Sequence, residues 1–126
     1  MNMKLDGKKI LIIEDENLMS QALSSKFKDA GFDVKSAQNG ENGLALLEKE
    51  NFDIILLDLV MPKLDGFKVL EMLKEKCIDT PVVVVTNLSQ PEDEKRTREL
   101  GVVEFIVKSN TPISEIVERV SNMLNI

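Results

Sequence analysis

Four short apolar runs in this chain are each followed by polar residues that can do chemistry. The first runs into Glu14 and Asp15, and the others run into Asp58, Thr86 and Lys108. Runs of this length that are rich in Val and Ile are typical of strands buried on both faces, as in a parallel sheet. Open parallel α/β sheets bind their ligands outside the carboxyl ends of the strands. The sequence therefore predicts three carboxylates, a hydroxyl and an ammonium group at one edge of one sheet.

Strand patterns alternate with helical patterns along the whole chain. The strand expected at residues 32–37 is more polar than the others, which favours a position near an edge of the sheet. The helix expected at residues 92–100 is nearly all charged, so we expect it to be weakly anchored. Such alternation through short connections predicts one α/β domain with a parallel sheet and right-handed crossovers. The expected strands cover residues 10–13, 32–37, 52–57, 82–85 and 102–107, and the expected helices cover residues 18–30, 39–50, 67–76, 92–100 and 113–124.

Length and composition limit the classes to which the protein can belong. A chain of 126 residues fits one domain, which we expect to cover residues 1–126. Its net charge of −6 argues against direct contact with nucleic acid, and no apolar stretch reaches the ~20 residues that cross a membrane. The absence of histidine excludes Ser-His-Asp catalysis, histidine-ligated zinc and a phosphohistidine on this chain. The single cysteine, Cys77, is expected to be half-buried on a helix, and its lack of a disulfide partner fits a cytoplasmic protein.

The residues that can do chemistry stand in an order and spacing that resemble a known family. The matching residues are Glu14, Asp15, Asp58, Gly66, Thr86, Phe105 and Lys108. Over nearly its whole length the chain is similar to the receiver domain of response regulators in two-component signal transduction, of the chemotaxis type. This resemblance implies a flavodoxin-like, doubly wound sheet of five parallel strands in the order 2-1-3-4-5, with five helices. Periodicity alone does not give that strand order.

The resemblance also implies roles for the residues at the sheet edge. Asp58 is the expected phosphoacceptor, because a carboxylate can attack a phosphoryl group and form an aspartyl-phosphate. Three carboxylates so close together require a proton or a cation, and the implied cofactor is Mg²⁺. Its expected ligands are Asp15, Asp58 and the backbone carbonyl of Val60, with Glu14 acting through water. Lys108 is expected to follow a strand central enough to aim its side chain at the site, and to pair with a phosphoryl oxygen or, in the empty site, with Asp58.

Each of these residues also has an ordinary structural interpretation. Asp58 can be a turn aspartate bound by backbone N–H groups, and the acid pair before the first helix can be a helix cap. Lys108 can be a solvated surface lysine, and Phe105 can be a static core ring. The joint order of the residues favours the functional interpretation at these positions.

The resemblance implies that Thr86 and Phe105 form a conformational switch. The Thr86 hydroxyl would bind the new phosphate, Phe105 would turn inward, and the surface of the fourth helix, fifth strand and fifth helix would change. The expected phosphodonor is a sensor histidine kinase or a phosphotransfer protein. The signal would pass to a downstream effector protein, to an output domain outside this chain, or into a phosphorylation-dependent homodimer. The chain would be no enzyme beyond catalysing its own phosphorylation and dephosphorylation.

Two residues depart from the common pattern of this family. A proline in a cis peptide usually follows the lysine, whereas Ser109 follows Lys108 here, so this loop is expected to be trans or strained. Asn87 stands where a small residue is usual, and we expect it to alter the lifetime of the phosphoryl group. These departures leave open an alternative function, a phosphate-independent interaction module with the same fold. A phosphatase is disfavoured, because Val60 stands where such enzymes carry a second aspartate.

Overall fold

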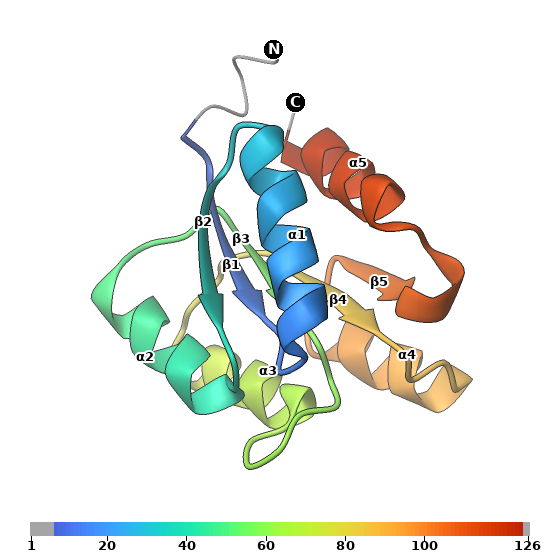
Figure 1. Ribbon diagram of the computed structural model, residues 1–126. Helices are drawn as coiled ribbons and strands as arrows, with labels where there is room; N and C mark the ends of the chain where they lie inside the picture. The colour runs from blue at the N-terminus through green and yellow to red at the C-terminus, as the bar shows by residue number, and fades with distance from the viewer. Residues whose placement is uncertain (1–6, 125–126) are drawn as a thin grey trace.

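Five parallel strands form one sheet in the computed structural model, which describes residues 7–124. Their order across the sheet is β2-β1-β3-β4-β5 (Figure 1), so the predicted α/β class and the predicted strand order are confirmed. Every neighbouring pair runs parallel. The strands are β1 (Lys9–Ile13), β2 (Asp33–Ala37), β3 (Ile54–Leu57), β4 (Val82–Thr86) and β5 (Glu104–Val107).

Helices connect the strands and cover both faces of the sheet. Figure 1 shows α1 and α5 on one face and α2, α3 and α4 on the other, which is the doubly wound arrangement that the resemblance implies. Within residues 7–124, no helix is both long and apolar enough to span a bilayer. The helices are α1 (Asn17–Asp29), α2 (Gly40–Lys49), α3 (Gly66–Glu75), α4 (Pro91–Glu99) and α5 (Ile113–Leu124), and a 3₁₀ turn, η2 (Lys108–Asn110), follows β5.

The core consists of two layers, one on each face of the sheet. In β1, Ile10 and Ile12 pack in the layer under α1 and α5, whereas Leu11 and Ile13 pack in the layer under α2 and α3. None of these four residues is more than 1% exposed. Burial on both faces explains why the strands appear in the sequence as continuous apolar runs rather than alternating ones.

The two edge strands differ in polarity. β2 exposes Asp33, Lys35 and Ser36, and its edge position is the one its polar sequence predicts. β5 forms the opposite edge, as the expected strand order places it, and Lys108 directly follows it. β5 is apolar despite its edge position, because its middle residue Ile106 is covered by α5 and is only 1% exposed.

The ends of the helices follow from local side chains and backbone conformation. The Asn39 side chain accepts a hydrogen bond from the backbone N–H of Asn42 at 2.8 Å, and the Asp65 side chain accepts one from Lys68 at 2.9 Å. These caps place the starts of α2 and α3. Cys77 is exposed and lies beyond the end of α3 with a φ angle of 57°, rather than half-buried within a helix as expected.

α4 has as little apolar surface as its sequence predicts, but polar contacts attach it to α3. Thr97 is its buried residue. The Arg96 guanidinium lies 4.2 Å from the centroid of the Phe67 ring, and its Nη2 atom lies 3.2 Å from a carboxylate oxygen of Glu71. A cation over an aromatic face and an ion pair thus link the two helices. The pattern of apolar residues gives no sign of this link.

Candidate functional site

Three carboxylates meet at the carboxyl edge of the sheet. β1 runs into Glu14 and Asp15, and β3 runs into Asp58. Because β1 and β3 are paired with Ile13 opposite Leu57, the residues that follow the two strands are neighbours. Oxygen atoms of the three carboxylates all lie within 4.8 Å of one another. Glu14 and Asp58 are buried, whereas Asp15 is exposed.

The carboxylates line an open hollow that we call the acidic hollow. Its volume is about 400 Å³, and it is large enough to admit a phosphoryl group with a metal ion. The side chain of Val60 is exposed at this hollow. The lining consists of Glu14, Asp15, Glu16, Asp58, Val60, Asn87 and Lys108.

Lys108 lies between the two buried carboxylates. Its Nζ atom is 2.9 Å from an oxygen of Asp58 and 2.5 Å from an oxygen of Glu14. The side chains of all three residues are at most 8% exposed. The contact with Asp58 is the one expected for a site without phosphate, whereas the contact with Glu14 was not predicted. β4 lies between β5 and β3 in the sheet, so the long Lys108 side chain bridges strand ends that are not neighbours.

Burial and charge shift the pKa values in this cluster. Burial raises the pKa of Glu14 above its ordinary value, although hydrogen bonds from Lys108 and from the backbone of Glu16 act in the opposite direction. Burial acts to lower the pKa of Lys108, but its hydrogen bonds to Glu14 and Asp58 outweigh that effect and raise it. The ammonium group therefore stays charged, while the charge on Glu14 is costly in the folded protein.

Backbone contacts fix the segment that carries Asp58. One Asp58 carboxylate oxygen accepts a hydrogen bond from the backbone N–H of Val60 at 3.2 Å. The backbone N–H of Gly66 donates to the carbonyl of Leu59 at 3.0 Å, so the loop folds back on the strand end. A Cβ atom at residue 66 would lie 2.5 Å from the carbonyl oxygen of Asp58. Only glycine permits this approach, which explains why the family pattern includes it.

The expected switch residues, Thr86 and Phe105, are buried on neighbouring strands. Thr86 is fully buried, and its hydroxyl oxygen accepts a hydrogen bond from the backbone N–H of Leu88 at 3.3 Å. Phe105 is 8% exposed and belongs to the core layer under α2 and α3. Thr86 is not part of the lining of the acidic hollow, so the structure does not join its hydroxyl to the carboxylates.

The two residues that depart from the family pattern contact each other. The Asn87 side-chain oxygen accepts a hydrogen bond from the backbone N–H of Ser109 at 3.0 Å. Within residues 7–124 every peptide bond is trans, and Lys108 begins the 3₁₀ turn η2. The loop is therefore trans, one of the two expected outcomes. Ser109 makes this contact possible because it retains the N–H group that proline would lack, but the sequence does not indicate the partner.

The acidic hollow can hold a divalent metal ion. Carboxylate oxygens are the ligands that hard cations such as Mg²⁺ and Ca²⁺ prefer, and three of them converge here. Two of the three acids share a single ammonium group, so the cluster carries uncompensated negative charge. A cation would supply the missing charge, and the exposed carboxylate of Asp15 leaves a path for it.

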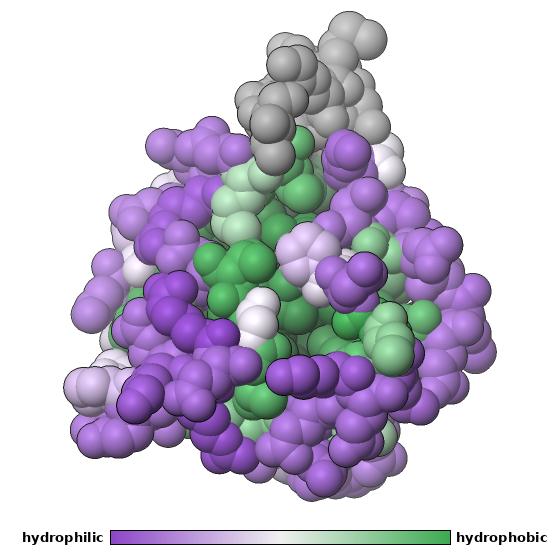
Figure 2. All heavy atoms as spheres, turned by 180° about the vertical axis from the view of Figure 1, so that it is seen from behind, coloured by the Kyte–Doolittle hydropathy of each residue, from purple (hydrophilic) through white to green (hydrophobic). Residues whose placement is uncertain are grey.

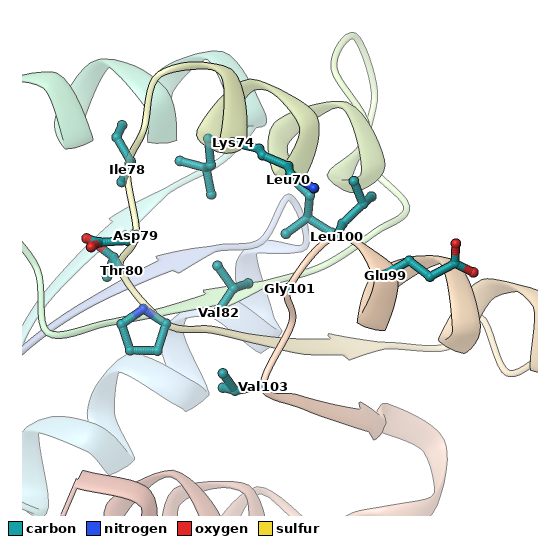
Figure 3. Close-up of a pocket in the computed structure, with 12 residues that line it drawn as sticks. Leu70, Lys74, Ile78, Asp79, Thr80, Val82, Glu99, Leu100, Gly101 and Val103 are labelled. Atoms are coloured by element: carbon teal, nitrogen blue, oxygen red, sulfur yellow. The ribbon is translucent and has the colours of Figure 1, made fainter.

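A second hollow lies at the opposite end of the sheet. Figure 2 shows apolar side chains gathered around a hollow in the face that α2, α3 and α4 cover. A hollow of about 350 Å³ lies near the amino ends of β4 and β5, with Leu70, Val82, Leu100 and other aliphatic side chains in its lining (Figure 3). Asp79 and Glu99 lie on opposite sides of it in this view. Among the residues that the structure describes, the group of three acids that could hold a metal ion lies at the acidic hollow and not here.

The chain matches a family of known proteins over most of its length. The family model described as "Response regulator receiver domain" matches residues 10–121. Over 120 residues the chain is 37% identical to "Probable transcriptional regulator ycf27" of Porphyridium aerugineum, a match that covers 95% of this chain and 49% of that protein. The chain spans about half the length of the curated relatives it matches.

Solved structures share the fold. The receiver domain of the Francisella response regulator 1452 is similar with a TM-score of 0.88 and 29% identity, over 94% of this chain and 98% of that one. The response regulator protein TrrA from Thermotoga maritima, solved in complex with Mg²⁺-BeF, is similar with a TM-score of 0.80 and 27% identity, over 92% of this chain and 98% of that one. The sheet and its helices therefore have close counterparts among solved receiver domains.

Proposed function

This chain belongs to the response regulator receiver domain family, and from that premise we propose that it is a phosphorylation-activated switch that accepts a phosphoryl group on Asp58. The observation that carries the proposal is the placement of Asp58. Its carboxylate lies in the acidic hollow, where the ammonium group of Lys108 and the backbone N–H of Val60 both contact it. These contacts orient one buried carboxylate toward solvent-borne donors.

The transfer we propose uses Asp58 as the nucleophile. One of its carboxylate oxygens forms a bond to phosphorus while the bond from phosphorus to the donor atom breaks, and that bonding electron pair leaves with the donor. The Lys108 ammonium group then moves part of its interaction from the carboxylate to a phosphoryl oxygen. Since Lys108 already lies 2.9 Å from Asp58, this change needs little movement.

The proposed cofactor is Mg²⁺, with Asp15, Asp58 and the carbonyl of Val60 as ligands and Glu14 acting through water. The convergence of carboxylate oxygens supports this choice, and the related TrrA was solved with Mg²⁺-BeF. When bound, the ion would withdraw charge from the phosphoryl oxygens during transfer. The pairing of Glu14 with Lys108 is consistent with an indirect role for Glu14.

The proposed output follows from the position of Thr86. Its hydroxyl is bound to the adjacent Leu88 backbone by a contact of 3.3 Å, which a phosphoryl oxygen could replace. Movement of Thr86 and Phe105 would then change the surface of α4, β5 and α5. The phosphodonor we propose is a sensor histidine kinase or a phosphotransfer protein in the cytoplasm. The proposed readers of the changed surface are an effector protein, an output domain or a second copy of the chain.

The test is phosphorylation by a small acyl phosphate, followed by intact mass. We expect a Mg²⁺-dependent gain of one phosphoryl group on the unmodified protein and no gain on Asp58→Asn. The matched control is Asp65→Asn, which makes the same change at a helix cap outside the acidic hollow. Asparagine caps helices about as well as aspartate, so this control should react like the unmodified protein.

Three outcomes would each contradict a part of the proposal. If the folded protein gains no phosphoryl group with Mg²⁺ present, the phosphate-independent interaction module becomes the better interpretation. If Asp58→Asn still gains one group, the acceptor lies elsewhere. A mass gain that does not depend on Mg²⁺ would remove the metal from the proposal.

A further inference from the structure

Asn87 connects two of the loops around the acidic hollow. It follows β4, lines the hollow and is exposed. Its side-chain oxygen accepts a hydrogen bond from the backbone N–H of Ser109, which follows β5. Ser109 is the neighbour of Lys108, so this contact acts on the segment that carries the ammonium group.

The turn that begins at Lys108 needs such a contact. The first N–H groups of a helical turn have no partner within the turn, and the residue before η2 provides no side-chain cap. Asn87 supplies the missing acceptor from the neighbouring loop. A proline at residue 109 would both remove the N–H group and disfavour the helical conformation of Lys108. The trans turn and the Asn87 contact are thus parts of one arrangement.

The arrangement determines where the ammonium group lies. The Lys108 side chain starts from the first residue of η2 and ends between Glu14 and Asp58. The carbonyl of Lys108 accepts a hydrogen bond from the backbone N–H of Thr111 at 3.2 Å, which closes the turn at its other end. A turn that is bound at both ends leaves the start of the lysine side chain little freedom.

We propose that Asn87 is a positioning residue for phosphoryl transfer: its hydrogen bond to Ser109 fixes the turn that directs the Lys108 ammonium group at Asp58. This inference rests on the proposed function. Asn87 acts on the reaction through the lysine. The change in phosphoryl lifetime that the sequence predicts would arise from this same side chain. A different role, in which Asn87 only obstructs the hollow, predicts the opposite result when the side chain is shortened.

The first measurement compares phosphorylation rates of variants with an acyl phosphate and Mg²⁺. Asn87→Ala should lower the rate about tenfold, because a small displacement of a charged group strongly slows a positioned reaction. Ser109→Ala is the matched control, since it keeps the N–H group and should stay within about twofold of the unmodified protein. In a Ser109→Pro background, which has no N–H group to bind, Asn87→Ala should change the rate less than about twofold.

The second measurement is independent of phosphorylation. Hydrogen exchange of the Ser109 amide, followed by NMR, should be slow in the unmodified protein and fast in Asn87→Ala. Asn87→Asp keeps an acceptor oxygen and should restore slow exchange. This rescue separates the loss of the hydrogen bond from a general disturbance of the loop, and thermal unfolding of each variant checks that it is folded.

The outcomes distinguish this inference from the proposed function. An unprotected Ser109 amide, an unchanged or faster rate in Asn87→Ala, or a tenfold effect that persists in the Ser109→Pro background would each overturn the positioning role. A protected amide in a protein that takes no phosphoryl group at all would instead show that the proposed function is wrong.

Discussion

Two clusters of three charged side chains lie at opposite ends of the sheet, and the signs of their charges are reversed. At the carboxyl ends of the strands, the single ammonium group of Lys108 lies between the carboxylates of Glu14 and Asp58. Near the amino end of β1, the single carboxylate of Glu50 lies between the ammonium groups of Lys9 and Lys35, at 2.6 and 3.1 Å. In each cluster, one charged group pairs with two groups of the opposite charge.

The clusters differ in burial, and this difference reverses the pKa shift of the acid. Hydrogen bonds from Lys9 and Lys35 lower the pKa of Glu50, which is half-buried. Burial raises the pKa of Glu14 despite its contact with Lys108. The Glu50 cluster is thus satisfied by its own partners, whereas the Lys108 cluster retains a cost that a metal ion or a change of protonation can relieve. A cluster of the second kind is suited to binding, because the ligand supplies what the protein lacks.

The largest expected effect comes from removing the shared charge of the buried cluster. Lys108→Met leaves two buried carboxylates without a cation, so we expect the free energy of unfolding to fall by about 3–5 kcal/mol in the absence of divalent ions. Urea unfolding with and without Mg²⁺ measures this, and Mg²⁺ should recover part of the loss because it restores a cation. The control, Lys95→Met, removes an exposed lysine and should change stability by less than about 0.5 kcal/mol. Equal losses in the two variants would show that Lys108 is not the buried cation on which Glu14 and Asp58 depend.

Much of this fold can be predicted from the sequence, because the patterns that identify its strands and helices are local. Apolar runs identify buried strands, and polar residues directly after them identify the functional edge, as Asp58 after β3 shows. The strand order needed the family resemblance, since hydrophobic periodicity does not specify which strands are neighbours. The hydrophobic pattern alone does not identify β5 as an edge strand, because a strand covered by α5 is as apolar as a central one.

The contacts within the site were only partly predictable. The convergence of Asp15, Asp58 and Glu14 follows from the parallel arrangement of β1 and β3. The contact of Lys108 with Glu14 depends on how far a long side chain reaches, which residue order does not encode. The bond from Ser109 to Asn87 joins two loops that are 22 residues apart in sequence, and the separate expectations for these two residues did not suggest that they meet.

Neutralising Glu14 should change the free energy of unfolding less than Lys108→Met does, and in the opposite direction. Because burial raises the pKa of Glu14, its ionisation destabilises the folded protein as the pH rises through that value. Glu14→Gln removes this cost and should raise the free energy of unfolding by about 0.5–2 kcal/mol at neutral pH, without divalent ions. The gain should disappear below the ordinary pKa of a glutamate, where the unmodified Glu14 is also neutral. Urea unfolding at several pH values tests this, and a loss of stability at neutral pH would mean that Lys108 compensates Glu14 fully.

The smallest effect should come from the matching change in the Glu50 cluster, with both the sign and the pH dependence reversed. Glu50→Gln should destabilise the protein at neutral pH, because the lowered pKa means that the folded state favours the charged form. That difference should be present above the ordinary pKa of glutamate and should vanish as the pH falls through the lowered value. Since Lys9 and Lys35 are partly open to solvent, added salt should also shrink it, whereas the effect of Lys108→Met should be nearly insensitive to salt. If the effects of Glu50→Gln and Lys108→Met depend equally on salt, the difference in burial does not explain how the two clusters differ.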